Sequence, residues 1–194
     1  MPSFDFFDSA DCQAAMLARQ EQLLLYSLIY ALEPKRVLEI GFAAGGSSRI
    51  ILAAICATSR TGQRLVSIDP QPTTVPEWTT DPRFELVRDT SPQAIPHAVE
   101  LLGGAIDFCL IDADHSEASV YADSGAVAPH IASEGYVLYH DAYYPTVASA
   151  VDRFLDGHAE FIDCGIIARF HSKKEPSPWG GFRLLRRVAY DETR

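Results

Sequence analysis

The sequence has few of the features that mark secreted, membrane-bound or metal-knuckle proteins. Its four cysteines are scattered and include no CxxC pair, so we expect free thiols, with Cys56 and Cys109 buried in apolar elements. No run approaches the roughly 18 apolar residues that a membrane helix requires. Residues 1–8 also lack the basic start and apolar core of a signal peptide. These absences predict a cytoplasmic protein without a membrane partner.

Positive charge is scarce as well. The 26 aspartates and glutamates outnumber the 16 lysines and arginines, and the formal net charge is -10. A nucleic acid or an anionic membrane would have to approach such a chain against repulsion. We therefore expect a small-molecule substrate and no nucleic acid partner. With 194 residues, 47% of them hydrophobic, residues 1–194 are predicted to form one domain.

Short apolar runs alternate with helical patterns along most of the chain. Leucines at helical spacing predict a helix over residues 13–32, within an N-terminal helical segment, 1–34, that leads into a sheet. The predicted strands are Val37–Ile40, Leu65–Ile68, Phe84–Val87, Ile106–Ile111 and Tyr136–Tyr139. Alternation of this kind indicates a parallel sheet with helices on both faces.

The pattern changes after the fifth of these strands. A helix is predicted over Pro145–Leu155, and two apolar runs, Phe161–Phe170 and Phe182–Val188, come next with no room between them for a crossover helix. The two runs are predicted to pair antiparallel at the sheet edge. The predicted fold class is therefore α/β, with a mostly parallel sheet of seven strands and an antiparallel last strand.

The stretch Arg36–Ser48 organises the predicted binding site. An apolar strand carries Glu39 near its end, Gly41 follows, and Gly45 and Gly46 lead into a helical pattern. Glycines let the backbone reverse sharply and approach a ligand closely. The free N–H groups at the start of a helix attract an anionic group. We expect a carboxylate or phosphate at this turn; a purely structural strand-to-helix connection is the alternative interpretation.

The spacing of this turn differs from the GxGxxG fingerprint of dinucleotide-binding proteins. The pattern Glu39-x-Gly41-x-x-x-Gly45 leaves room for an amino-acid moiety in place of a pyrophosphate. The next acid to end a strand is Asp69, which follows the apolar run Leu65–Ile68. At the carboxyl edge of the sheet, its carboxylate can accept both hydroxyls of a ribose.

These motifs resemble those of the class I S-adenosylmethionine (SAM)-dependent methyltransferases, which have a Rossmann-like fold, and the resemblance covers nearly the whole chain. The residues that it assigns to SAM are Glu39, Gly41, Phe42, Gly45, Ser47, Asp69, Asp89, Thr90 and Asp112. The turn that contains Gly41, Gly45 and Gly46, called the glycine loop below, would hold the methionine part of SAM, and Asp69 would bind its ribose. Asp89 and Thr90 follow the third strand, where the family contacts adenine, but either could instead cap the next helix.

Two polar clusters follow the fourth and fifth predicted strands. They are Asp112-Ala113-Asp114-His115 and His140-Asp141. Because neighbouring parallel strands end at the same edge of a sheet, both clusters are expected where the methyl group of SAM would point. Oxygen ligands with one imidazole suit Mg²⁺, Mn²⁺, Ca²⁺ or a similar ion at an open site.

The two clusters resemble those of the metal-dependent O-methyltransferases of the catechol and caffeoyl-CoA type. They are more similar to the macrocin O-methyltransferase and cephalosporin hydroxylase group, whose Asp-x-Asp-His-Ser and late His-Asp pattern reappears here. By position, the resemblance implies Asp112, His140 and Asp141 as ligands of Mg²⁺ or another divalent cation, and His115 as the catalytic base. The catechol type has lysine and a carboxylate in place of the two histidines, so a site without a metal is the alternative.

The resemblance implies SAM-dependent O-methylation of a small hydroxylated molecule, such as a sugar or a phenol. A homodimer is expected only from the family. Two other functions are compatible with the same motifs: metal-independent methylation of another atom, and non-catalytic binding of SAM or S-adenosylhomocysteine (SAH). Tyr143, Tyr144 and Trp179 could line the acceptor pocket, although aromatic residues at such positions often serve packing instead.

Overall fold

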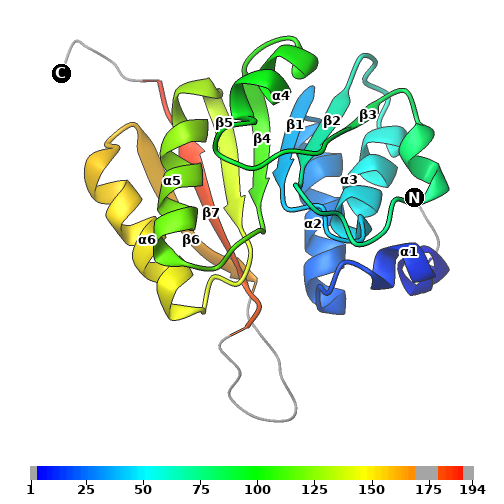
Figure 1. Cartoon of the computed structure of the whole chain (residues 1–194), viewed down its shortest axis with the longest axis horizontal. Coiled ribbons are helices and arrows are strands. Elements are labelled where there is room, and N and C mark those ends of the chain that lie inside the picture. The colour runs from blue at the N-terminus through cyan, green and yellow to red at the C-terminus, as the bar shows by residue number, and fades with distance from the viewer. Residues whose placement is uncertain (1–3, 169–178, 190–194) are drawn as a thin grey trace.

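The computed structural model describes residues 4–168 and 179–189. Its centre is a seven-stranded sheet with the order β3-β2-β1-β4-β5-β7-β6 (Figure 1). The strands are β1 (Arg36–Ile40), β2 (Arg64–Ile68), β3 (Phe84–Val87), β4 (Ile106–Ile111), β5 (Ile131–Tyr139), β6 (Phe161–Ala168) and β7 (Phe182–Arg187). Strands β1 to β5 are parallel, and β7 runs antiparallel to both β5 and β6. The predicted sheet is confirmed, with β7 inserted between β5 and the edge strand β6.

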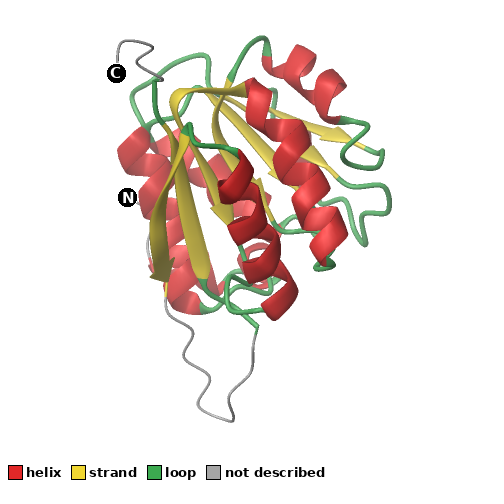
Figure 2. Cartoon of the chain, turned by 90° about the vertical axis from the view of Figure 1, so that its left-hand side faces the viewer, coloured by secondary structure: helices red, strands yellow, loops and turns green. Residues whose placement is uncertain are grey.

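Helices cover both faces of the sheet (Figure 2). They are η1 (Phe4–Asp8), α1 (Ala10–Gln13), α2 (Arg19–Leu32), α3 (Gly46–Ala57), η2 (Glu77–Thr80), α4 (Ile95–Leu102), α5 (Glu117–Val127), η3 (Ala128–His130) and α6 (Pro145–Gly157). Buried side chains of α4, α5 and α6 form one apolar core against the strands, and those of α1, α2 and α3 form a second core. Within the described part of the chain, no helix combines the length and hydropathy needed to cross a membrane.

The central strands are buried on both faces, as expected for a parallel sheet. In β4, Phe108 and Leu110 belong to the core with α2 and α3, whereas Cys109 and Ile111 belong to the core with α4, α5 and α6. All four side chains are between 0% and 4% exposed. Most buried side chains of the central strands are apolar, and the buried polar residues Glu39 and Ser67 lie next to the carboxyl ends of β1 and β2.

The helix predicted over residues 13–32 is interrupted. Helix α1 ends at Gln13 and α2 begins at Arg19, so the prediction is wrong for residues 14–18. Met16 has a positive φ of 54°, which a helix does not allow. The carboxylate of Glu21 then accepts a hydrogen bond of 2.7 Å from the backbone N–H of Ala18 at the start of α2. The leucine spacing located α2 correctly, but it could not indicate this break.

Other boundaries depart from the prediction in smaller ways. Strand β5 begins at Ile131, five residues before the predicted Tyr136, because the first part of the strand is only partly apolar. The end of the run predicted as Phe161–Phe170 lies outside the described residues beyond Ala168. All four cysteines are free. The prediction that Cys56 is buried is wrong, because it lies away from the face through which α3 packs.

Gly41 should be indispensable to this fold. It has a φ of +102°, and a Cβ atom there would lie 1.9 Å from the carbonyl oxygen of Asp112. We expect Gly41→Ala to lower the free energy of unfolding by about 3 kcal/mol, from strain and overpacking together. Gly125→Ala in α5 is the control, because nothing lies within 4 Å of its new Cβ; it should raise stability by about 0.5–1 kcal/mol. Urea denaturation measures both, and equal midpoints would contradict the prediction.

Candidate functional site

Two cavities lie over the carboxyl ends of the central strands. The first cavity, of about 540 Å³, is lined by residues 14–16, Ala18, Glu21, the glycine loop, the residues after β4 and β5, and residues 179–180. The second cavity, of about 390 Å³, is lined by the ends of β1 and β2, the residues after β3 and β4, and Ser119 and Asp123 of α5. Both include Gly41, Ala43, Asp112 and Ala113 in their walls. The two cavities therefore adjoin and offer room for one elongated ligand.

The glycine loop connects β1 to α3 at the wall shared by these cavities. Gly45 precedes α3 with a φ of +80°, in the left-handed region that favours glycine. A Cβ atom at Gly46 would lie 1.9 Å from the backbone nitrogen of Ala15, so residues 14–15 pack directly against the start of α3. Gly46 and Ser47 line the first cavity. Their position at a helix N-terminus suits an anionic group.

Asp69 lies where the sequence predicted it, in the wall of the second cavity. Its Oδ2 accepts hydrogen bonds from the backbone N–H groups of Phe42 (3.1 Å) and Ala43 (2.7 Å), and its Oδ1 accepts one of 2.8 Å from Gln71. A carboxylate can accept about four hydrogen bonds. Asp69 thus fixes the glycine loop and retains capacity for a ligand hydroxyl.

Glu39 lies beneath the loop, outside the walls of both cavities. Its carboxylate is fully buried and accepts hydrogen bonds from the hydroxyls of Ser47 (2.5 Å), Ser48 and Ser67 (2.6 Å). Burial raises the pKa of Glu39 to about 7, although the three hydroxyls oppose the shift. Glu39 therefore acts on the site through Ser47, which lines the first cavity.

Of the other residues assigned to the cofactor, Phe42 and Thr90 line a cavity and Asp89 does not. Phe42 lines the first cavity and packs on Trp78, and Thr90 lines the second. Asp89 lines neither; its Oδ1 accepts a hydrogen bond of 2.7 Å from the N–H of Thr90. Neither residue caps the next helix, because the residue before α4 is Ala94. The alternative role of Asp89 or Thr90 as a helix cap is therefore wrong.

Asp112, His115, His140 and Asp141 come together at the ends of β4 and β5. Nε2 of His115 lies 2.6 Å from Oδ2 of Asp141, and Nδ1 of His140 lies 3.1 Å from Oδ1 of Asp112 and 3.4 Å from Oδ2 of Asp141. The hydrogen bond to Asp141 raises the pKa of His115. Burial opposes ionisation of Asp141, but hydrogen bonds from both histidines hold its pKa well below the ordinary value.

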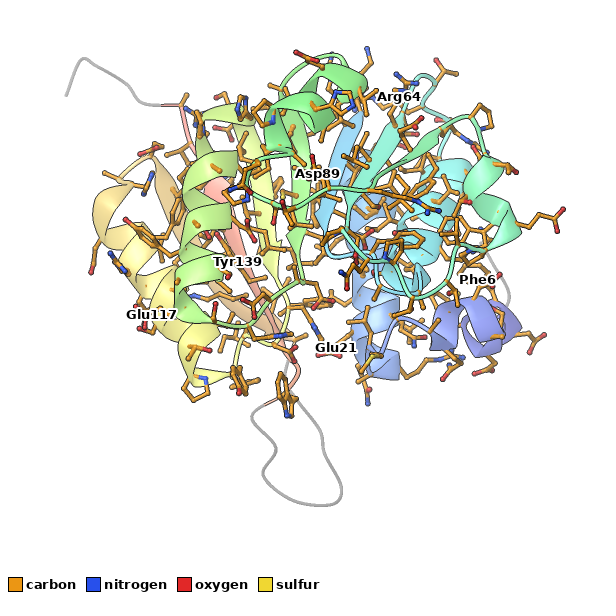
Figure 3. All side chains as sticks on the ribbon, viewed as in Figure 1. Phe6, Glu21, Arg64, Asp89, Glu117 and Tyr139 are labelled. Atoms are coloured by element: carbon orange, nitrogen blue, oxygen red, sulfur yellow. The ribbon has the colours of Figure 1, made fainter. Side chains whose placement is uncertain are left out.

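Glu21, labelled on α2 in Figure 3, contacts this cluster and was not predicted. It is 2% exposed, and its Oε2 lies 3.5 Å from Nε2 of His140. Its Oε1 accepts a hydrogen bond of 2.5 Å from the N–H of Gly181. One signal in the sequence could have identified it: Glu21 lies between Leu17 and Leu25 at intervals of four residues, so it is an acid on the apolar face of the helix.

The three carboxylates around His140 outweigh its burial. Burial lowers the pKa of the imidazole, but the charge of Asp112 and the contacts of the ring nitrogens with the carboxylates of Asp112, Asp141 and Glu21 raise it to about 12. His140 therefore carries a positive charge between carboxylates in this arrangement. The first cavity has no lysine or arginine in its described wall, so a histidine or a bound cation must balance the acids.

A possible metal site coincides partly with the predicted one. Among the described residues, Asp112, His115 and Asp141 each offer a ligand atom, and these atoms lie within 4.8 Å of one another. The sequence predicted His140 as the third ligand, in place of His115. Two carboxylates and one imidazole fit Mg²⁺ or Mn²⁺ in either combination. Asp112 and Asp141 are common to both.

Aromatic residues close the side of the site next to His115. Trp179 lines the first cavity and stacks on Tyr144, with ring centroids 4.2 Å apart. The same indole lies edge-on to the ring of His115 at 5.1 Å. Tyr143 and Tyr144 do not line either cavity. Of the three predicted lining residues, only Trp179 contributes to the wall, and Tyr144 supports it from behind.

A family model described as "Methyltransferase domain" matches residues 38–142. This range covers more than half of the chain and extends from β1 to the residue after Asp141. The chain therefore belongs to this methyltransferase family. No curated protein matches the chain.

Solved structures agree with the family match. The O-methyltransferase TomG from Streptomyces achromogenes, in complex with SAM, is 16% identical, with a TM-score of 0.72 over 97% of this chain and 92% of that one. An O-methyltransferase from Bacillus cereus in complex with SAH is 14% identical, with a TM-score of 0.69 over 96% and 92%. The methyltransferase MycE from the mycinamycin biosynthetic pathway, in complex with Mg, SAH and mycinamycin VI, is 17% identical, with a TM-score of 0.57 over 82% of this chain and 46% of that one. The predicted Rossmann-like methyltransferase fold is confirmed.

The buried carboxyl of Glu39 should make stability depend on pH. The pKa of Glu39 is about 7 in the folded protein and exceeds the ordinary value of 4.5. Its contribution to the free energy of unfolding is therefore full below about pH 4.5 and is lost as the pH rises through 7. Glu39→Gln keeps the shape and removes the titration. From about pH 5 to about pH 7.5, the free energy of unfolding of the wild type should fall by about 2–3 kcal/mol relative to Glu39→Gln. Denaturant titrations at several pH values measure this; parallel pH profiles would refute it.

Proposed function

We propose that this protein transfers the methyl group of SAM to a hydroxyl group of a small molecule. The observation that carries the proposal is the pair of adjoining cavities, with the carboxylate of Asp69 in the wall of one and a histidine hydrogen-bonded to a carboxylate in the wall of the other. The structural relatives that bind SAM or SAH support the choice of cofactor. The scarcity of positive charge in the chain supports a small-molecule acceptor over a nucleic acid.

In the proposed complex, SAM would lie in one orientation along the two cavities. Its carboxylate would meet the N–H groups of Gly46 and Ser47 at the start of α3, and its ribose hydroxyls would meet Asp69. The adenine would enter the second cavity between Ile68 and Ala113. The sulfonium methyl would then point into the first cavity, toward Asp112 and His115. Glu39 would support this arrangement only indirectly, through Ser47.

His115 is the proposed catalytic base. When the neutral ring carries its proton on Nε2 and donates a hydrogen bond to Asp141, Nδ1 has a free lone pair. Nδ1 can then take the proton of the acceptor hydroxyl. The oxygen then forms its bond to the methyl carbon while the bond from that carbon to sulfur breaks, and SAH leaves. Proximity and alignment supply much of the acceleration in such a displacement, and proton removal adds to it.

Asp112 and Asp141 are the proposed carboxylate ligands of Mg²⁺ or a similar ion, which would make the acceptor hydroxyl more acidic. A cation held together with His140, as the motif implies, leaves His115 free as the base. A cation held together with His115 removes that base. Metal-independent transfer is the second candidate, because a protonated His140 would already place a positive charge between Asp112 and Asp141.

Binding of SAH tests the cofactor directly. A ligand of the folded state raises the melting temperature by mass action, so SAH should raise it in the wild type, and Mg²⁺ or Mn²⁺ should raise it further if the site takes a metal. Asp69→Asn should weaken SAH binding by about tenfold or more, because a charged hydrogen-bond acceptor is lost. Isothermal titration calorimetry gives the affinities.

Asp107→Asn is the matched control for Asp69→Asn. Asp107 also accepts hydrogen bonds from two backbone N–H groups, those of Lys35 and Arg36, but it lies at the opposite end of the sheet. Its substitution should lower stability and leave SAH affinity unchanged. A wild type that binds no SAH would refute the proposed function. Equal effects of the two substitutions on affinity would remove Asp69 from the binding site.

His115→Ala should separate binding from catalysis. Loss of the base should reduce methyl transfer by about 100-fold or more, whereas SAH affinity should change little. Formation of SAH with a panel of hydroxylated sugars and phenols identifies an acceptor and measures the rate. His97→Ala is the control, because His97 lies on α4 with an exposed side chain. Unchanged turnover in His115→Ala would remove His115 from catalysis.

A further inference from the structure

Asp123 is a buried acid in the wall of the second cavity that neither the motifs nor the proposed mechanism uses. It comes from α5 and is 3% exposed. The cavity wall also includes Thr90 and Ser91, which follow β3, and Ser119, one turn before Asp123 on the same helix. A carboxylate of an interior helix face therefore lies against the space that the adenine would occupy.

The other carboxylates of this cavity already have hydrogen-bond donors. Asp69 has three backbone N–H groups. Asp114 has the hydroxyls of Ser116 and Ser119, at 2.8 and 2.6 Å. Asp112 has the imidazole of His140. Each of the three is thus held in place by the protein itself.

Asp123 has fewer hydrogen-bond donors than Asp69 or Asp114. Within the described part of the chain, the hydroxyl of Ser91 is its one side-chain hydrogen-bond donor, although a carboxylate can accept about four hydrogen bonds. Burial accordingly raises the pKa of Asp123 to about 6, and the Ser91 hydroxyl only partly opposes this. A buried acceptor that lacks donors costs free energy unless a ligand supplies them.

The walls of the cavity show what kind of donor fits. Ile68, Pro70 and Ala113 give it apolar surface, which suits the faces of a flat ring, and the polar groups of Thr90, Ser91 and Asp123 are available to the ring edge. Adenine carries an amino group at position 6, which is a donor, whereas hypoxanthine and guanine carry an oxygen there, which is an acceptor. A carboxylate attracts the first and repels the second.

We propose that Asp123 accepts a hydrogen bond from the 6-amino group of the adenine and selects an amino purine over an oxo purine in the cofactor. This assignment rests on the proposed SAM-dependent function. It gives α5 a part in recognition, in addition to the residues after β1, β2 and β3. Polar sites that are built for a particular donor discriminate strongly against an analogue that lacks it.

The test compares two ligands that differ at one position of the purine. SAH carries the 6-amino group, and S-inosylhomocysteine carries an oxygen there. In calorimetric titrations, the wild type should bind SAH at least about tenfold more tightly. Asp123→Asn should reduce this ratio to about threefold or less, because an amide can donate to the oxygen as well as accept from the amine. Asp107→Asn, outside both cavities, should keep the ratio of the wild type.

The outcomes separate this assignment from the function on which it rests. A wild type that binds SAH but does not distinguish the two ligands overturns the role of Asp123, and this measurement needs no variant. Equal weakening of both ligands by Asp123→Asn, with an unchanged ratio, also overturns it, because a purely structural contact with Ser91 would act in that way. Failure of the wild type to bind either ligand would refute the proposed function itself.

Discussion

The site depends on backbone hydrogen bonds that continue the parallel sheet one residue beyond β1, β2, β4 and β5. The N–H groups of Gly41, Asp69, Asp112 and His140 donate to carbonyl oxygens of neighbouring strands at 2.9 to 3.1 Å. These residues therefore lie in a row across the carboxyl edge, in an order fixed by the strand order. Because the sheet interior is packed with apolar side chains, polar groups gather at this edge. The lack of a side chain at Gly41 lets the row close up between β1 and β4.

Much of this could be predicted from the sequence, because periodicity and chain order determine it. Alternating apolar runs located the strands, and the row of polar residues followed from the strand ends. The break at residues 14–18 and the approach of Glu21 to His140 could not be predicted in that way. Both depend on contacts between parts of the chain far apart in sequence. The supporting role of Glu39 is similar, since its partner Ser67 lies on another strand.

The electrostatics of the first cavity set it apart from a site built around a lysine. Glu21, Asp112 and Asp141 surround His140, and the pKa values of the histidines are raised in consequence. The carboxylates would repel one another without these cations. The arrangement can therefore balance its charge internally, and a metal ion would have to compete with an imidazolium for the same oxygens. Acceptors that bear a carboxylate or phosphate of their own would meet further repulsion here.

Glu21 also shows how the molecule divides its tasks. One of its carboxylate oxygens accepts from Ala18 and the other from Gly181, so segments 160 residues apart meet beside His140. Both segments lie outside residues 38–142, the part that the family match covers. The contact beside His140 therefore joins two segments that both lie outside the matched range, whereas the residues assigned to the cofactor lie within it. New substrate preferences could arise in this architecture without disturbing the machinery that handles the methyl donor.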